Sequence, residues 1–241
     1  MSLHLSRIRL KHAPSAAALA RVLLPEDEEA RVGASHRLVW SLFADTPDRT
    51  RDFLWREDGG STWQRTTFLV LSARPPADEH GLFELESKPF APALEAGQRL
   101  GFRLRASPSA NQPREPGQRG KRIDPLAKVL TGLSKQERAE HRHRVTQEVG
   151  AAWLARQGAR AGFRLAEEAD GEGEGRSPLH VDGDRWRVIP RERGARPVRF
   201  PSLDFEGTLS VGDPALFLAG IAQGFGRAKA FGCGLMLIRR V

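Results

Sequence analysis

The segment from Gly97 to Ala106, which reads GQRLGFRLRA, decides how the chain is organised. Its apolar residues Leu100, Phe102 and Leu104 alternate with glycine and arginine, and this period of two predicts a half-buried strand with a basic outer face. The strand begins near the middle of the 241 residues, after a stretch that has predicted strands and helices of its own. We therefore expect a second domain to begin here.

The residues before this strand have the pattern of one small domain of strands and helices. The expected elements are a strand at 2–10, helices at 15–24 and 35–43, and strands at 52–56, 66–71 and 82–86. An acidic turn at 26–29 separates the two helices, and the pair Gly59-Gly60 suits a hairpin between the second and third strands. The order strand, helix, strand, strand, turn or helix, strand is that of a ferredoxin-like domain.

The residues after Gly97 repeat this order. Ser134 and Glu137 form a capping box, which starts a helix that we expect to run to residue 156 and stop at Gly158. Asp213 caps a later helix, in which Pro214 takes the first position. The strands expected in this half are 97–106, 185–189, 205–211 and 235–238.

The repeated pattern predicts an α+β fold of two tandem ferredoxin-like (RRM-like) domains, with residues 1–95 in the first and 96–241 in the second. The helix positions expected to be buried in the second domain are Val145, Val149, Ala152, Trp153, Leu216, Phe217 and Ile221. An acidic, glycine-rich surface loop is expected at 167–175.

The charge balance favours a polyanionic partner. The chain has 38 Lys and Arg against 30 Asp and Glu, a net charge of +8. The basic loop region 107–145 holds nine basic and four acidic residues (9 − 4 = +5), and we expect its first part, 107–121, to be a mobile loop. A genome rich in GC also favours arginine codons, so charge alone does not identify the partner.

The residue types argue against several other classes of protein. Cys233 is the only cysteine, so the chain forms no internal disulfide and no zinc cage. The sequence has no signal-like apolar run, no stretch of about 18 apolar residues, no HExxH and no paired CxxC. We expect a soluble, cytoplasmic protein without a metal, a cofactor or a membrane partner.

The glycine-rich stretch 224–234 is a candidate phosphate-binding loop. It lacks the Gly-Lys-Ser/Thr ending of a Walker loop and the spacing of a dinucleotide fingerprint. The amides at Gly224 and Gly226 could still face a phosphate, with Arg227 and Lys229 adding positive charge. The alternative is that Gly224 ends a helix and the other glycines form a tight return to the last strand.

His36 is the candidate catalytic residue. In the helix expected at 35–43 it lies at the edge of the apolar face, with Trp40 one turn later, while Arg37 and Ser41 point toward water. A half-exposed imidazole with a pKa near neutrality can act as a general acid or base. A histidine packed at a core margin produces the same pattern, so these residues leave both interpretations open.

Five segments together resemble one known family, the type I-E CRISPR endoribonucleases, or CasE subunits of the Cascade complex. The segments are Ser35–Phe43 (SHRLVWSLF), Arg51–Trp55 (RDFLW), Phe102–Pro108 (FRLRASP), Phe205–Leu209 (FEGTL) and Gly224–Leu235 (GFGRAKAFGCGL). The resemblance implies tandem ferredoxin-like domains that cut repeat hairpins of a CRISPR transcript, with the catalytic histidine of the first-helix motif at His36. It also implies the CRISPR repeat stem-loop, its crRNA product and other Cascade subunits as partners.

Our hypothesis is that the RNA supplies its own 2′-hydroxyl nucleophile, with His36 accepting that proton or donating one to the leaving 5′-oxygen, and without a metal. The residues expected to contact RNA are Arg37, Arg103, Arg105, Lys121, Arg122, Gly224, Gly226, Arg227 and Lys229. Some family members have a helper tyrosine one turn before the histidine, where this chain has Gly33 and no tyrosine anywhere. A non-catalytic RNA-hairpin-binding subunit is therefore the main alternative, and an enzyme that binds a nucleotide with its glycine loop is a third.

Overall fold

The computed structural model describes residues 2–44, 50–60, 62–112, 121–166, 179–190 and 196–241. For Asn111, Lys121, Arg122 and Asp184 it describes the backbone alone. The acidic loop expected at 167–175 lies outside the described residues.

The chain divides into two compact units that are not continuous in sequence. Unit 1 consists of Met1–Ala93, Arg187–Phe200 and Ala228–Leu235, and unit 2 of Leu94–Trp186, Pro201–Arg227 and Met236–Val241. Two short stretches from the second half of the chain thus belong to the first unit, and one of them is most of the glycine-rich segment. The division into 1–95 and 96–241 stays a prediction.

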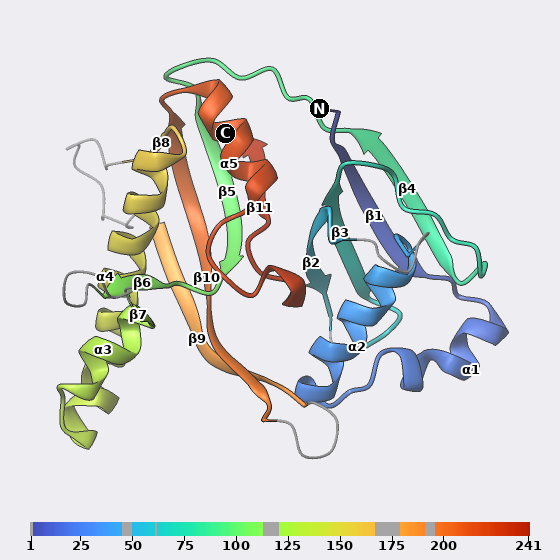
Figure 1. Cartoon of the computed structure of the whole chain (residues 1–241), viewed down its shortest axis with the longest axis horizontal. Coiled ribbons are helices and arrows are strands. Elements are labelled where there is room, and N and C mark those ends of the chain that lie inside the picture. The colour runs from blue at the N-terminus through green and yellow to red at the C-terminus, as the bar shows by residue number, and fades with distance from the viewer. Residues whose placement is uncertain (1, 45–49, 61, 113–120, 167–178, 191–195) are drawn as a thin grey trace. The chain divides into compact units, whose positions relative to one another are not determined.

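Unit 1 is built on a four-stranded antiparallel sheet. Its elements are β1 (His4–Leu10), α1 (Pro14–Leu23), α2 (Glu28–Ser41), β2 (Phe53–Gly59), β3 (Thr66–Ser72), β4 (Phe83–Pro89) and the 3₁₀ turn η1 (Lys229–Phe231). The strand order β2-β3-β1-β4 is that of a ferredoxin-like sheet. Figure 1 shows α1 and α2 in the connection between β1 and β2, and the core contains α2 residues such as Val39 packed with sheet residues such as Phe68.

Helix α2 begins seven residues earlier than the pattern predicted. The residues expected to form an acidic turn instead start the helix, because the Asp27 side chain caps it by accepting from the Ala30 amide at 2.8 Å. Glu28 and Glu29 occupy the first turn, where negative charge offsets the positive end of the helix dipole. His36 therefore lies roughly two turns inside the helix rather than near its start.

A polar network attaches α2 to the sheet one turn before His36. Arg31 is buried, and its Nε lies 2.6 Å from Oε1 of Glu57 on β2. The hydroxyl of Ser35, which is fully buried, donates to Glu57 Oε2 at 2.9 Å. Arg31 also donates to the Thr66 hydroxyl on β3. Two charge-assisted bonds converge on the Glu57 carboxylate, so the network fixes where the helix sits on the sheet.

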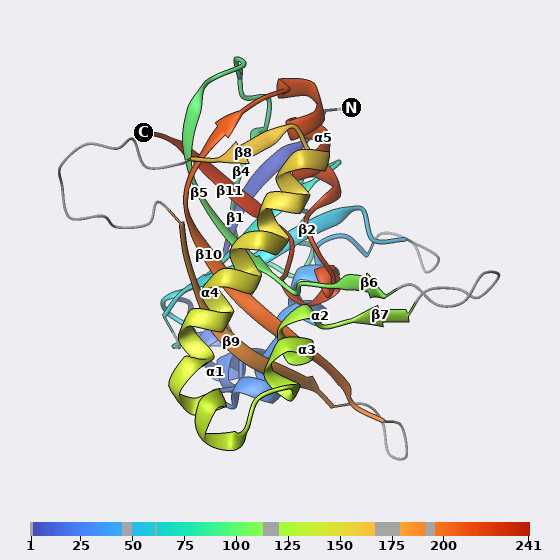
Figure 2. The same ribbon diagram turned by 90° about the vertical axis from the view of Figure 1, so that its left-hand side faces the viewer.

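Unit 2 is built on a five-stranded sheet. Its elements are β5 (Arg99–Ala106), β6 (Ala110–Gln112), β7 (Lys121–Ile123), α3 (Pro125–Thr131), α4 (Lys135–Arg160), β8 (Phe163–Leu165), β9 (Leu179–Ile189), β10 (Val198–Val211), α5 (Pro214–Gln223) and β11 (Met236–Arg240), with the ends of β9 and β10 assigned to unit 1. The sheet order is β11-β5-β10-β8, with β9 also paired to β10, and α4 lies across it (Figure 2). The predicted α+β fold with two tandem ferredoxin-like domains is confirmed.

Residues 113–120, within the loop expected at 107–121, lie outside the described residues. The rest of the basic region 107–145 is largely regular. It contains the antiparallel pair β6–β7 and two helical segments, α3 and the first turns of α4. The sequence pattern missed α3 because it is short, although Asp124 caps it and Pro125 takes its first turn. The basic residues of this region therefore lie on regular elements wherever they are described.

Helix α4 starts at the predicted capping box but ends later than expected. It continues through Gly158 to Arg160, and a Cβ at Gly158 would lie 2.6 Å from the Phe163 carbonyl oxygen. That glycine serves close packing rather than helix termination. Two helix positions that we expected to be buried are exposed, Ala152 on α4 and Leu216 on α5. On each helix, the surface that other elements cover is narrower than the apolar face.

Candidate active site and RNA-binding surface

His36 lies in a half-buried position on α2 with aromatic rings on two sides. Its ring centroid is 6.0 Å from that of Trp40 and 5.5 Å from that of Phe231 on η1. Trp40 in turn packs on Phe53 at 5.5 Å. Nδ1 of His36 is buried and has no hydrogen-bond partner within the part of the chain that the structure describes. The aromatic wall leaves the imidazole partly shielded from water, and such burial is one way in which proteins tune the pKa of a proton-transfer group.

The glycine-rich segment reaches His36 through the backbone of η1. The indole Nε1 of Trp55 donates to the carbonyl oxygen of Ala230 at 3.0 Å, which attaches the segment to β2. Gly232 has φ +79°, and a Cβ there would lie 3.2 Å from the Trp55 ring, so glycine allows this close approach. The second half of the predicted loop therefore brings Phe231 to the histidine, and Lys229 lies two residues before it on η1.

The surroundings of His36 favour its neutral form. Burial lowers the pKa of His36 below its ordinary value of about 6.5, and the positive charges of Arg51 and Arg37 lower it further. The Ala230 carbonyl acts in the opposite direction and raises the pKa. A neutral imidazole at pH 7 can accept a proton, so the site suits a general base.

Arg51 is a site residue that sequence reasoning did not select. Its Nη1 donates to the Phe53 carbonyl at 3.0 Å, just before β2 begins, and burial lowers its pKa. Burial and the charge of Arg51 also lower the pKa of Lys229. Two cationic side chains from distant segments therefore lie close enough to repel each other. The signal was present, since Arg51 opens one of the five segments that carry the family resemblance.

Arg37 lies over Gly33, which is one helical turn before His36. Its side chain is exposed, and Nη1 is 3.6 Å from where a Cβ of Gly33 would be. Arg37 also lowers the pKa of His36. The guanidinium of Arg37 thus lies beside the space that Gly33 leaves one turn before His36.

In unit 2, the two predicted arginines of β5 share one sheet face and make cross-strand ion pairs with β10. Arg103 Nε is 3.8 Å from Glu206 Oε2, and both side chains are exposed. Arg105 is held more closely, with Nε 3.0 Å from Asp204 Oδ1 and Nη2 3.1 Å from Oδ2. A bound phosphate would have to compete with these carboxylates, so their contact with RNA stays a prediction.

The first half of the glycine-rich segment uses several amides within unit 2. The Gly224 amide donates to the Gly220 carbonyl at 2.9 Å, and the Arg227 amide to the Ser107 carbonyl at 3.0 Å. A Cβ at Gly226 would lie 2.7 Å from that Ser107 oxygen. These contacts give a structural reason for glycine at positions 224 and 226. Phosphate binding by their amides stays a prediction.

The predicted residues fall into two groups. The structure brings His36, Arg37 and Lys229 together in unit 1, while the other predicted RNA contacts belong to unit 2. Lys121 and Arg122 lie in β7, where their side chains are outside the described residues.

A model of the family described as CRISPR associated protein matches residues 3–240. The Cse3 endoribonuclease of Thermus thermophilus is 31% identical over 193 residues, covering 77% of this chain and 78% of that protein. The chain belongs to the Cse3/CasE family of CRISPR-associated proteins. The Cascade subunit CasE of Escherichia coli K12 is 26% identical over 226 residues, covering 90% of this chain and 96% of that protein.

Solved structures of Cse3/CasE proteins agree with this assignment. Thermus thermophilus Cse3 bound to an RNA representing a pre-cleavage complex is 27% identical, with a TM-score of 0.68 over 99% of this chain and 100% of that one. Escherichia coli Cas6e shares the fold at 21% identity, with a TM-score of 0.61 over 99% and 100% of the two chains. The family resemblance predicted from the five segments is confirmed.

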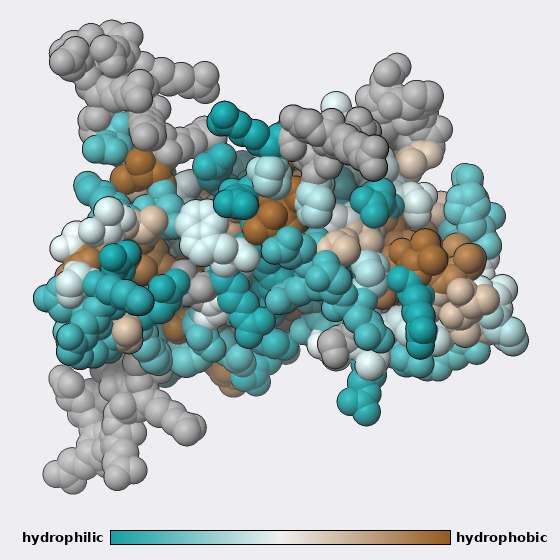
Figure 3. All heavy atoms as spheres, turned by 90° about the horizontal axis from the view of Figure 1, so that it is seen from below, coloured by the Kyte–Doolittle hydropathy of each residue, from teal (hydrophilic) through white to brown (hydrophobic). Residues whose placement is uncertain are grey.

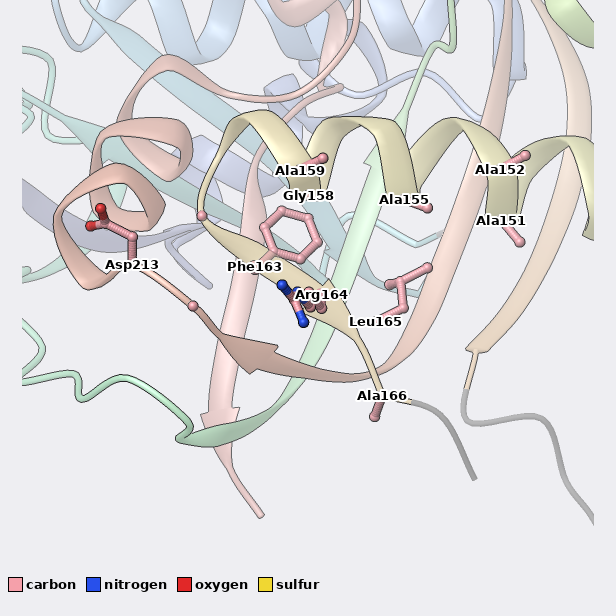
Figure 4. A pocket seen from close by; sticks show the side chains of 12 residues that line it. Ala151, Ala152, Ala155, Gly158, Ala159, Phe163, Arg164, Leu165, Ala166 and Asp213 are labelled. Atoms are coloured by element: carbon pink, nitrogen blue, oxygen red, sulfur yellow. The ribbon is translucent and has the colours of Figure 1, made fainter. Parts of the chain in front are cut away.

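One open groove of this Cse3/CasE protein is lined by none of the predicted site residues. It has a volume of about 780 Å³ and runs along α4 and β8 of unit 2, lined mainly by small residues such as Ala155 and Ala159 (Figure 4). No residue predicted to contact RNA lines it. The face drawn in Figure 3 is hydrophilic over most of its described atoms.

In the ranges that the structure covers, no three His, Cys, Asp or Glu side chains group as metal ligands would. The same ranges contain no helix with the length and apolar character needed to cross a membrane.

Proposed function

We propose that this protein is the guide-RNA-processing endoribonuclease of a type I-E CRISPR system, which binds the repeat hairpin of the CRISPR transcript and cuts it. The observation that carries the proposal is His36, a half-buried imidazole with a lowered pKa on the helix that matches the family's catalytic motif. The relative named an endoribonuclease, Thermus thermophilus Cse3, supports it, and this relative was solved with an RNA representing a pre-cleavage complex.

The chemistry needs little beyond what the described residues offer. Neutral His36 accepts the proton of the 2′-hydroxyl beside the scissile phosphate, and the 2′-oxygen attacks phosphorus as the bond to the 5′-oxygen breaks. The leaving 5′-oxygen takes a proton from water, so the products are a 2′,3′-cyclic phosphate and a 5′-hydroxyl. Proton transfer by one positioned side chain contributes roughly 10²- to 10⁴-fold to the rate. DNA lacks the 2′-hydroxyl and therefore survives.

RNA binding in this proposal rests on basic residues of both units. An RNA stem hides its base edges in a deep groove, so the protein reads the stem mainly through its shape and phosphates. Arg37 and Lys229 of unit 1, and Arg103, Arg105, Lys121, Arg122 and Arg227 of unit 2, supply the positive charge, while Gly224 and Gly226 supply close backbone approach. The protein acts in the cytoplasm, keeps its crRNA product and joins other Cascade subunits, as the relative named a Cascade subunit suggests.

A second candidate is a subunit that binds the hairpin without cutting it. Gly33 favours this alternative, because the position used for a helper tyrosine in some relatives carries no side chain here. Both candidates bind the same RNA, so binding alone does not separate them.

The deciding experiment incubates end-labelled hairpin RNA of the CRISPR repeat with the protein in EDTA. The enzyme yields one discrete product ending in a cyclic phosphate, and His36→Ala loses at least about 10²-fold in rate while it keeps its hairpin affinity. His80→Ala, an exposed histidine in a turn of unit 1, is the matched control. Bound but intact RNA with the wild-type protein would establish the non-catalytic alternative.

A further inference from the structure

Two aromatic rings of unit 1 that have no role in the proposed reaction lie next to His36. Its ring centroid is 6.0 Å from that of Trp40 on α2 and 5.5 Å from that of Phe231 on η1. The two ring planes are tilted by 48° and 56° to the imidazole, so neither ring lies flat on it. Trp40 and Phe231 are both partly exposed. Aromatic surface therefore reaches solvent beside the candidate catalytic group.

Phe231 is already stacked on another ring, whereas Trp40 is not. The rings of Phe231 and Phe200 are nearly parallel, with 20° between their planes and 5.7 Å between their centroids. Trp40 contacts Phe53 at 5.5 Å with a tilt of 56°, and its contact with His36 is tilted as well. Among the aromatic rings that the structure describes, none lies parallel to this indole. A flat group from outside the chain can therefore stack on the exposed part of the indole.

The last turn of α2 holds Trp40 in place. Val39 beside it is fully buried in the core of unit 1, and the hydroxyl of Ser41 donates to the Leu38 carbonyl at 2.8 Å. Trp40 follows His36 by four positions, about one helical turn, so the two side chains lie on the same side of the helix. The helix therefore carries the imidazole and the indole at a set separation.

The proposed cleavage requires one nucleotide to leave the regular RNA stack. Attack on phosphorus needs the 2′-oxygen in line with the bond to the departing 5′-oxygen, and a regular RNA helix does not place it there. Turning the nucleotide out of the helix costs free energy, because its base loses its stacking neighbours. Proteins offset this cost by stacking the splayed base on an aromatic side chain. Because His36 takes the proton of the 2′-hydroxyl, this base has to be held close to the imidazole.

We propose that Trp40 stacks on the base of the nucleotide that carries the attacking 2′-hydroxyl, and so holds this nucleotide in line for cleavage beside His36. The inference rests on the proposed RNA cleavage and gives Trp40 a role in binding the substrate. Stacking uses the ring face that every base has, so Trp40 favours an unstacked base at the cut without selecting its identity.

The test measures single-turnover cleavage of the repeat hairpin with the protein in excess but below saturation, so that the rate includes the binding step. Trp40→Leu keeps an apolar side chain and removes the ring, and we expect its rate to fall about 10-fold, the size of effect that loss of one base–aromatic stack produces. Trp40→Phe keeps a ring and should lose less than about 3-fold. Trp186→Leu, which removes an exposed tryptophan of β9, is the matched control and should cut at the wild-type rate.

A hairpin that lacks one base separates stacking from a structural role. In this hairpin, the nucleotide at the cut keeps its ribose and its 2′-hydroxyl but has no base. The wild type should cut it about 10-fold more slowly than the intact hairpin. Trp40→Leu should cut the two hairpins at nearly equal rates, because the stack is already lost. If Trp40 only supported the position of His36, the two losses would multiply.

The outcomes are separable from those of the proposed function. Equal wild-type rates on the intact and the base-free hairpin would overturn this inference and leave the endoribonuclease intact, and so would two losses that multiply. If Trp40→Leu does not fold, Trp40→Met, whose side chain is also apolar and without a ring, takes its place in the same comparison. A wild-type protein that cuts no repeat hairpin would instead refute the proposed function itself.

Discussion

The indole Nε1 of Trp55 and the carbonyl oxygen of Ala230 are joined by a hydrogen bond of 3.0 Å, although the two residues lie 175 positions apart. Trp55 is buried in the core of unit 1, so this bond attaches η1 to the sheet. The same Ala230 carbonyl acts on His36. One backbone oxygen therefore connects the core, the glycine-rich segment and the proposed catalytic imidazole.

Trp55→Phe should weaken both folding and cleavage. The variant keeps the ring in the core but leaves the Ala230 carbonyl without its donor, which costs about 1–3 kcal/mol of unfolding free energy. Cleavage should slow because η1 is no longer fixed beside His36. Urea denaturation and single-turnover rates measure the two effects. Trp186→Phe, an exposed tryptophan of β9, should change neither by a comparable amount.

The cleavage rate should fall in acid through the titration of His36. Burial and two neighbouring cations lower its pKa, so the base is neutral at pH 7 and loses activity only as the pH drops through a value below about 6.5. With limiting amounts of RNA, the rate profile reports the pKa values of the free protein. A lower inflection at or above 6.5, or an NMR titration of His36 in that range, would contradict the assigned surroundings.

The Glu57 network should determine how firmly α2 is attached. Glu57→Ala leaves buried Arg31 without this carboxylate and Ser35 without its acceptor. We expect a loss of about 2–3 kcal/mol in unfolding free energy. This is at or below the low end of the cost of breaking a buried ion pair, because Glu57 keeps some contact with solvent. Thermal and urea unfolding measure it. Glu84→Ala, whose carboxylate pairs with Arg9 on the surface, should cost less than about 1 kcal/mol.

Removing the carboxylate beside Arg103 should strengthen RNA binding. Glu206 lies 3.8 Å from Arg103 and competes with phosphate for it. Glu206→Gln should therefore tighten hairpin binding about 2- to 5-fold at low salt. This change corresponds to the free energy of one exposed ion pair. Arg103→Ala should weaken binding and reduce the slope of log affinity against log salt by about 1.

Titrations of labelled hairpin at several salt concentrations give both values. Glu84→Gln is the matched control, since its partner Arg9 is not a predicted RNA contact. Unchanged affinity in Glu206→Gln together with an unchanged salt slope in Arg103→Ala would remove this face of β5 from the RNA surface.

The amino-acid sequence alone determined the repeated strand–helix order and several element ends. Strand β5 follows from the alternation around Phe102, the start of α4 from the Ser134 capping box, and the start of α5 from Asp213 with Pro214. These features depend on side-chain periodicity and on bonds between residues a few positions apart, which any local stretch of sequence carries. The placing of His36 beside Trp40 has the same origin, one helical turn.

The tertiary structure decided what surrounds that histidine. Neither Arg51 nor the Ala230 carbonyl is near His36 in sequence. No local sequence pattern predicts that these distant segments pack near the histidine. The ion pair of Arg103 with Glu206 likewise depends on the register between β5 and β10. Such contacts arise from the packing of segments far apart in the chain. A sequence therefore indicates which residue can move a proton, and folding determines the charges that set its pKa.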